Sequence, residues 1–142
     1  MKILRLALGL MLAVILTTMT VGTALAGTTV DERIEEDLEM KSKVMGVEGT
    51  ITELLLKKDG DDVDFRIKVE VEGLKPEGKF ILVKGMHTIA TEMADEDGKL
   101  TFDVELDKFG KDTLVGLKFQ VQCAKTYTPV LTRIIYADDL KD

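Results

Sequence analysis

The sequence predicts an all-β fold, an antiparallel sandwich of about seven strands in two sheets, behind an N-terminal segment of a different kind. Residues 63–72 alternate strictly between apolar and charged, which places the two kinds of side chain on opposite faces of a strand. Turn-forming residues recur every ~8–12 positions between such runs, as they do in two-sheet sandwiches and in small barrels, the alternative architecture. No strand–helix–strand alternation interrupts this pattern, so a parallel doubly wound sheet is not expected.

The N-terminal segment has the layout of a secretory signal peptide. Lys2 and Arg5 precede an apolar run over residues 6–24, and small residues close the segment at Ala26. We therefore expect cleavage after Ala26. A retained anchor is the alternative, because the run approaches the ~20 residues that cross a bilayer. In both cases we expect a secreted or cell-envelope protein, with membrane contact only through residues 1–26 when these are retained.

The rest of the chain is strongly acidic. Without the two basic residues of that segment, 17 Lys and Arg stand against 26 Asp and Glu, a net charge of −9. Such a chain is not expected to bind nucleic acid or an anionic membrane surface. The absence of asparagine and the abundance of charged side chains favour a thermophilic source. Cys123 is the only cysteine, so no intramolecular disulfide can form. We interpret it as a small buried residue, with an intermolecular disulfide as the alternative.

The clearest pair of strands covers residues 47–58 and 63–72. Asp-Gly lies between them at residues 59–60, and this is a hairpin signal because glycine supplies the positive φ of a tight turn. The first strand alternates less cleanly at residues 53–56, where we expect a β-bulge.

Five further strands complete the predicted sandwich. They cover residues 80–83, 87–94, 100–106, 115–123 and 130–136. Short turns separate most of them, and the charged residues that follow the last strand are expected to fray.

Residues 27–43 are ambiguous. Thr29 and Glu32 have the spacing of a capping box, which predicts a helix, whereas apolar residues alternate from Leu38 as in a strand. We expect a short helix or loose arm to about Asp37, and then a strand. The predicted organisation is a signal peptide or anchor, an arm, a sandwich domain and a charged tail, at residues 1–26, 27–43, 44–137 and 138–142.

A nucleophilic site would need His87, the only histidine, beside Ser42 or Cys123. None of the three lies in a sequence context typical of a catalytic nucleophile. His87 shares strand parity with Ile89 and Met93, which favours a structural position, inward or at the rim beside a turn. The chain also has no tryptophan platform for sugars and no glycine-rich phosphate loop. Neither an enzyme nor an organic cofactor is expected.

The sequence offers ligands for two kinds of metal site. Copper accepts the ligand types of Cys123, His87, Met86 and Met93, but the strand pattern accounts for Cys123 and Met93 as core residues. Calcium is the better candidate, because acidic side chains crowd two turns that could share one ion if they lie at one end of the sandwich. The candidate calcium ligands are Asp59, Asp61, Asp62, Asp64, Asp95 and Asp97. Acidic turns that are simply solvated are the alternative interpretation.

Two stretches resemble known modules. Residues 73–80 and 94–102 resemble the strand–turn–strand rhythm of extracellular immunoglobulin-like and fibronectin-type modules. Residues 49–74 are similar to the opening strands of copper/zinc superoxide dismutase and chordin-type domains. The histidine-rich motif of those families is absent at residues 81–83, so the resemblance implies a fold and not dismutase chemistry.

These features favour an exported, non-catalytic protein with a role in adhesion, cell-envelope structure or recognition. Its partner would be a protein or another envelope component, a second copy of itself included. One alternative is a filament-forming subunit whose arm adds as a donor strand to the open sheet edge of a neighbour. The other is a small calcium- or copper-binding protein.

Overall fold

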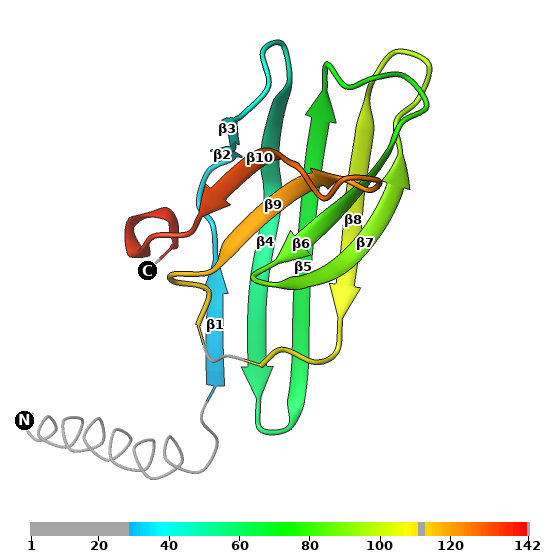
Figure 1. Cartoon of the computed structure of the whole chain (residues 1–142). Coiled ribbons are helices and arrows are strands. Elements are labelled where there is room, and N and C mark those ends of the chain that lie inside the picture. Colours follow the sequence, from blue (N-terminus) through cyan, green and yellow to red (C-terminus); the bar gives the residue numbers. More distant parts are fainter. Residues whose placement is uncertain (1–28, 111–112, 142) are drawn as a thin grey trace, which may run out of the picture.

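The computed structural model describes residues 29–110 and 113–141, which form a sandwich of two antiparallel β-sheets (Figure 1). The fold class predicted from the sequence is thereby confirmed. Sheet I has the strand order β1-β4-β5-β8, with β2 also paired to β4, and sheet II has the order β3-β10-β9-β6-β7. The strands are β1 (Thr29–Arg33), β2 (Leu38–Glu39), β3 (Lys41–Ser42), β4 (Glu48–Asp59), β5 (Asp62–Glu72), β6 (Lys79–Lys84), β7 (His87–Met93), β8 (Leu100–Leu106), β9 (Lys118–Cys123) and β10 (Pro129–Ile134).

Sheet I is built on the long β4–β5 hairpin that the sequence predicted. Asp59 pairs with Asp62, so Gly60 and Asp61 form a two-residue loop, and Gly60 has a φ of +62°. The apolar residues of β5 point between the sheets and its charged residues point outward. The predicted alternation is therefore confirmed.

The predicted bulge lies slightly earlier in β4 than the irregular stretch of sequence suggested. The register between β4 and β5 shifts between Ile51 and Glu53, which makes Thr52 the extra residue. Ile51 and Leu54 are three positions apart, yet the bulge turns both of them into the core, where they are fully buried.

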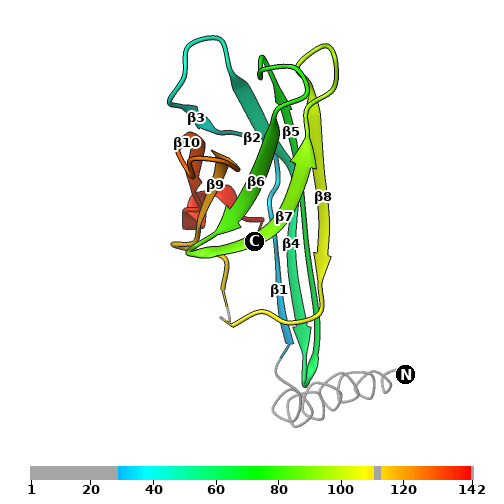
Figure 2. The same ribbon diagram turned by 45° about the vertical axis from the view of Figure 1, so that its right-hand side comes forward.

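Sheet II packs over sheet I, as the side view in Figure 2 shows. Strand β6 pairs with β7 on one side and with β9 on the other. A register shift in the β6–β7 pair lets the successive residues Ile89 and Ala90 both pack against the core. The shift also reverses the parity of the end of β7, so Met93 points outward and is 57% exposed. The interpretation of Met93 as a core residue was therefore wrong.

The interior holds together by packing alone. Among the described residues the fully enclosed side chains are apolar, and no polar or charged residue is buried. At one end of the sandwich, Phe109 from the β8–β9 connection stacks on Phe65 with ring centroids 4.9 Å apart. Phe119 lies on Phe65 at 6.2 Å, and the Lys84 ammonium lies 4.7 Å from the Phe109 centroid. This aromatic cluster closes the core at that end of the sandwich.

The described part of the arm forms strands, so the predicted helix was wrong. Strand β1 pairs with β4 from Thr29 opposite Asp59 to Arg33 opposite Leu55, and β2 pairs further along the same edge. The long edge of β4 offers backbone donors and acceptors that a helix would have left unpaired. The Glu32 carboxylate, instead of capping a helix, accepts the Leu114 N–H at 2.6 Å. The predicted signal peptide, residues 1–26, lies outside the described residues.

The C-terminal tail is docked and not frayed. Residues Ala137–Asp139 form a 3-10 turn, and Leu140 forms a β-bridge with Ile34 of the β1 side. The Asp139 carboxylate accepts a hydrogen bond from Arg133 at 2.6 Å. Burial opposes ionisation of Asp139, but the Tyr136 N–H and the Arg133 guanidinium outweigh it and lower its pKa. The tail therefore covers part of the sheet I edge.

Candidate functional site

The three residues considered for nucleophilic chemistry lie far apart. His87 is exposed at the start of β7, opposite Lys84 of β6. Cys123 ends β9 opposite Phe80, which is four positions from Lys84, or about 13 Å along the strand. Ser42 lies in β3 at the other edge of sheet II, with β10, β9 and β6 between it and β7. The rim position expected for His87 is confirmed, and no base meets a nucleophile here.

The candidate copper ligands do not converge either. Cys123 packs against the core but is only half-buried, so the interpretation of it as a buried residue holds in part. The Thr126 hydroxyl, together with the N–H groups of Lys125 and Thr126, lowers the pKa of the Cys123 thiol. Met86 is 93% exposed in the β6–β7 turn, and Met93 points away from the core. A copper site built from these side chains does not form in this structure.

The acidic turns lie at opposite ends of the sandwich (Figure 1). One follows β4, whereas the other precedes β8, whose Leu100 pairs with Val71 at the far end of β5. Eleven residues of β5 separate them, or about 36 Å of extended chain. The two groups comprise Asp59, Asp61, Asp62 and Asp64, and Asp95 and Asp97. The expectation that they share one calcium ion was therefore wrong, and the described residues hold no group of three or more metal-ligating side chains.

Two of these carboxylates have structural partners of their own. The Asp95 Oδ1 atom accepts the N–H groups of Lys99 at 2.9 Å and of Asp97 at 2.8 Å, which fixes the turn before β8. These bonds, that of Lys99 first, lower the pKa of Asp95. Asp64 forms an ion pair with Arg66 at 3.3 Å and raises the pKa of that guanidinium. Both carboxylates stabilise local structure.

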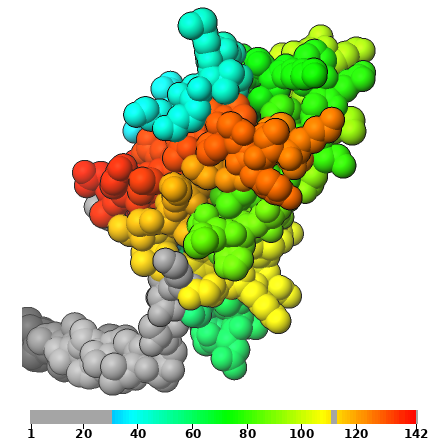
Figure 3. All heavy atoms as spheres, in the orientation of Figure 1, coloured from blue at the N-terminus to red at the C-terminus, as the bar shows by residue number. Residues whose placement is uncertain are grey.

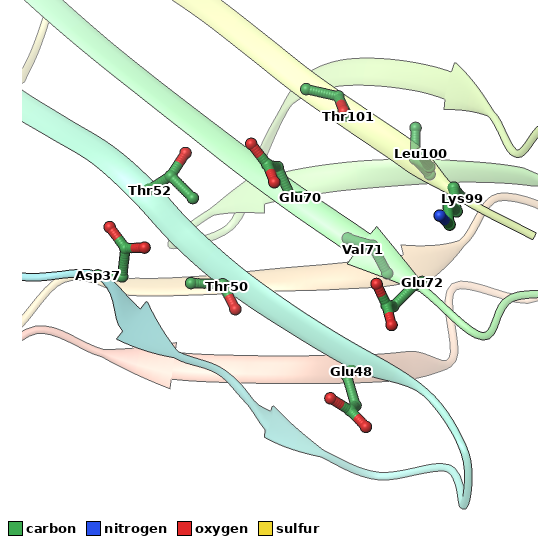
Figure 4. A pocket seen from close by; sticks show the side chains of 10 residues that line it. All are labelled: Asp37, Glu48, Thr50, Thr52, Glu70, Val71, Glu72, Lys99, Leu100 and Thr101. Atoms are coloured by element: carbon green, nitrogen blue, oxygen red, sulfur yellow. The ribbon is translucent and has the colours of Figure 1, made fainter.

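The outer face of sheet I carries an acidic hollow of about 340 Å³ (Figure 4). Glu48, Glu70 and Glu72 stand on the same side of β4 and β5, with Asp37 beside them. Glu48 and Glu72 are direct cross-strand partners, an unfavourable placement for like charges. Among the described residues, none of these four carboxylates has an ion pair or a side-chain hydrogen bond. The remaining lining residues are Thr50, Thr52, Val71, Lys99, Leu100 and Thr101.

The outer face of sheet II has the opposite character, and Figure 3 views the molecule from this side. By strand register, none of the described outward positions of its strands holds Asp or Glu. We call this surface the carboxylate-free face. Its residues are Lys41 of β3, Pro129, Thr132 and Ile134 of β10, Lys118, Gln120 and Gln122 of β9, Lys79, Ile81 and Val83 of β6, and Thr88, Thr91 and Met93 of β7.

The centre of the carboxylate-free face is uncharged and ordered by side-chain hydrogen bonds. Gln122 donates to Gln120 at 2.8 Å, and Gln120 donates to Thr132 at 3.3 Å, which forms a row across β9 and β10. Beside this row, Ile81 and Val83 point outward but are each only 6% exposed. The lysines stand around this centre, and no described ion pair engages them. The face thus has an uncharged centre with lysines around it, and Glu39 of the neighbouring β2 lines a hollow beside Lys41 and Thr132.

Sequence reasoning did not identify either face. Alternation separates inward from outward residues within one strand, but it does not show which strands share a sheet. The sequence did contain one compositional signal for the difference between the faces. The polar residues of the strand at 118–123 are Lys and Gln, whereas those of the strand at 63–72 are charged residues of both signs.

Comparison with protein-family models gives no match for this chain. A search of curated proteins likewise finds no relative. No helix in the part of the chain that the structure describes is long and apolar enough to cross a membrane.

Proposed function

We propose that the protein is a non-catalytic binding module of the cell envelope or the extracellular space, and that its carboxylate-free face is the contact surface. One observation carries this proposal. A chain with 26 acidic residues places none of them on the outward positions of sheet II. Solvation alone does not require such segregation, whereas a surface that meets an acidic partner does, because like charges across an interface are costly.

The strand order supports an immunoglobulin-like identity for this module. In that fold, strands A, B and E share one sheet, and strands G, F, C and C′ can form the other. The seven strands β4 to β10 follow the same arrangement, with β4-β5-β8 in sheet I and β10-β9-β6-β7 in sheet II. With one cysteine and no tryptophan, the chain would be such a sandwich without the inter-sheet disulfide of antibody domains.

The proposed location rests on the N-terminal sequence. A basic start, an apolar run and small residues at Ala26 support export, with a retained anchor as the alternative. The scarcity of amide side chains supports a heat-tolerant source, because these groups are thermolabile.

Cysteine labelling on intact producing cells tests the contact surface and the location together. In a Cys123→Ala background, Thr91→Cys places a thiol on the carboxylate-free face. Asp61→Cys places the control thiol at the tip of the β4–β5 hairpin, and both native side chains are exposed. The rate of modification by a membrane-impermeant maleimide is compared between intact cells and dilute purified protein.

We expect the hairpin thiol to react equally fast in both settings and the Thr91→Cys thiol to react several-fold more slowly on cells. Equal rates for Thr91→Cys would contradict the proposed contact surface, and labelling that requires cell lysis would contradict export. Purified protein is expected to show no hydrolase or oxidoreductase turnover. Turnover that disappears in His87→Ala would refute the non-catalytic assignment.

A further inference from the structure

We propose that the occupant of the carboxylate-free face is a second copy of this chain, which presents the acidic hollow of its sheet I. The inference rests on the proposed function, because it names the partner of the surface assigned there. Each molecule would then bind one neighbour through sheet II and another through sheet I, in a head-to-tail stack.

Charge complementarity carries the choice of partner. The acidic hollow gathers Glu48, Glu70 and Glu72, which lack ion-pair partners in the described structure. Lys79 and Lys118 of the carboxylate-free face are exposed and equally without ion pairs. A stack would place unpaired cations of one molecule against unpaired anions of the next, which guides encounter and fixes orientation.

The layout of the carboxylate-free face is that of a protein contact. Protein interfaces combine a centre depleted of charge with a polar, solvated rim. Here Ile81, Val83 and the Gln122–Gln120–Thr132 row form the centre. Lys79 is the first residue of β6, and Lys118 is the first residue of β9. Because β6 and β9 are antiparallel neighbours, these two lysines lie at opposite ends of the face. The two lysines therefore bracket the centre.

The geometry of the sandwich makes the contact open-ended and weak. The two surfaces lie on opposite sides of the molecule, so their association is heterologous and can continue without closing. Four strands of six or seven residues and the two-residue β3, about 4.8 Å apart, give a face of at most roughly 20 Å by 20 Å, which is small for a stable interface. Association should therefore depend on protein concentration and on salt.

Sedimentation velocity of the full chain, produced with its own N-terminal segment, tests the stack. The weight-average mass is measured over a concentration series at about 0.1 M and about 1 M salt, which shortens the screening length from ~10 Å to ~3 Å. The test variant is Lys79→Glu with Lys118→Glu. The matched control is Lys108→Glu with Lys125→Glu, which makes the same charge change at exposed loop positions.

At the lower salt we expect the mass of the native protein to rise with concentration. The test variant should associate about tenfold more weakly, because two rim attractions become repulsions, and the control should match the native protein. High salt should weaken association of the native protein. A native protein that stays monomeric at every concentration, or a control that weakens association as much as the test variant, would overturn the inference.

This experiment separates the inference from the proposed function. Protection of Thr91→Cys on cells, together with a purified protein that stays monomeric, would mean that another molecule covers the face, and the inference alone would fail. Free access to Thr91→Cys on cells would instead remove the proposed function, whatever the purified protein does.

Discussion

Gly73, in the turn between β5 and β6, offers a sharp test of the structure when it is compared with Gly116. The two glycines have the same backbone conformation and differ in the space around them. Gly73 has a φ of +84° and Gly116 a φ of +85°, so alanine at either position suffers the same backbone strain. A Cβ atom at Gly73 would overlap the carbonyl oxygen of Gly46, whereas a Cβ at Gly116 would have nothing within 4 Å. The substitutions therefore isolate the close approach of two turns.

The expected magnitudes follow from these contacts. The left-handed conformation costs a non-glycine residue roughly 1–2 kcal/mol, and this should be the whole cost of Gly116→Ala. Gly73→Ala must also move one backbone segment away from another, which adds a further ~2 kcal/mol or more and brings the total to about 3–4 kcal/mol. That is a large share of the ~5–15 kcal/mol that stabilises a typical domain.

Urea denaturation followed by circular dichroism measures both costs. We expect Gly73→Ala to lower the midpoint about twice as far as Gly116→Ala, with an unchanged slope if both remain two-state. Equal losses for the two variants would refute the reasoning, because the approach of Gly46 to Gly73 would then not exist in solution.

Three further predictions concern the core, the tail and calcium. Phe109→Ala should cost about 3–5 kcal/mol of unfolding free energy, since it removes the nearer of the two rings stacked on Phe65; a loss below ~1 kcal/mol would contradict the aromatic cluster. The pKa of Asp139 is lowered in the folded chain, so ionised Asp139 stabilises the fold. This stabilisation is complete above the pKa that Asp139 has in the unfolded chain, and it is lost as the pH falls through its lower pKa in the folded chain. The protection of the Lys141 N–H, which donates to the Arg33 carbonyl, should therefore fall in acid once the exchange rate is corrected for the intrinsic pH dependence of amide exchange, and Asp139→Asn should remove this fall. Calcium at ~1 mM should add less than ~0.5 kcal/mol of stability, because the acidic turns are too far apart to share an ion, and a larger gain in calorimetry would contradict their separation.

The sequence was sufficient for the parts of the fold that depend on one strand at a time. Alternation along β5 and the Asp-Gly turn before it have a local cause, so the pattern predicted them correctly. Alternation placed Met93 wrongly in the core, because the bulge at Ile89 reverses the inward and outward positions after it. That bulge arises from the pairing of β6 with β7, and the residues of β7 alone do not indicate it. The helix predicted from Thr29 failed for a similar reason, since the edge of β4 decides the conformation of that segment.

The candidate surfaces were harder to predict than the fold. Glu48 and Glu72 lie on adjacent strands, so a correct hairpin register would have placed them together. Lys79 and Lys118, in contrast, share a face only because β6 pairs with β9, a contact between segments far apart in the chain. The idea that the two acidic turns share one calcium ion failed for the same reason. Strand order and direction place the turns at Asp59 and Asp95 at opposite ends of β5, and the local sequence does not show this.

The stack itself can be tested by mixing two variants, each with one damaged surface. Lys79→Glu/Lys118→Glu keeps the acidic hollow, and Glu70→Gln/Glu72→Gln keeps the carboxylate-free face. Each variant alone should remain largely monomeric, and a mixture should give one-to-one dimers that do not grow, because each dimer exposes only damaged surfaces. A mixture that stays monomeric, or that grows beyond dimers, would contradict the pairing of sheet II of one molecule with sheet I of the next.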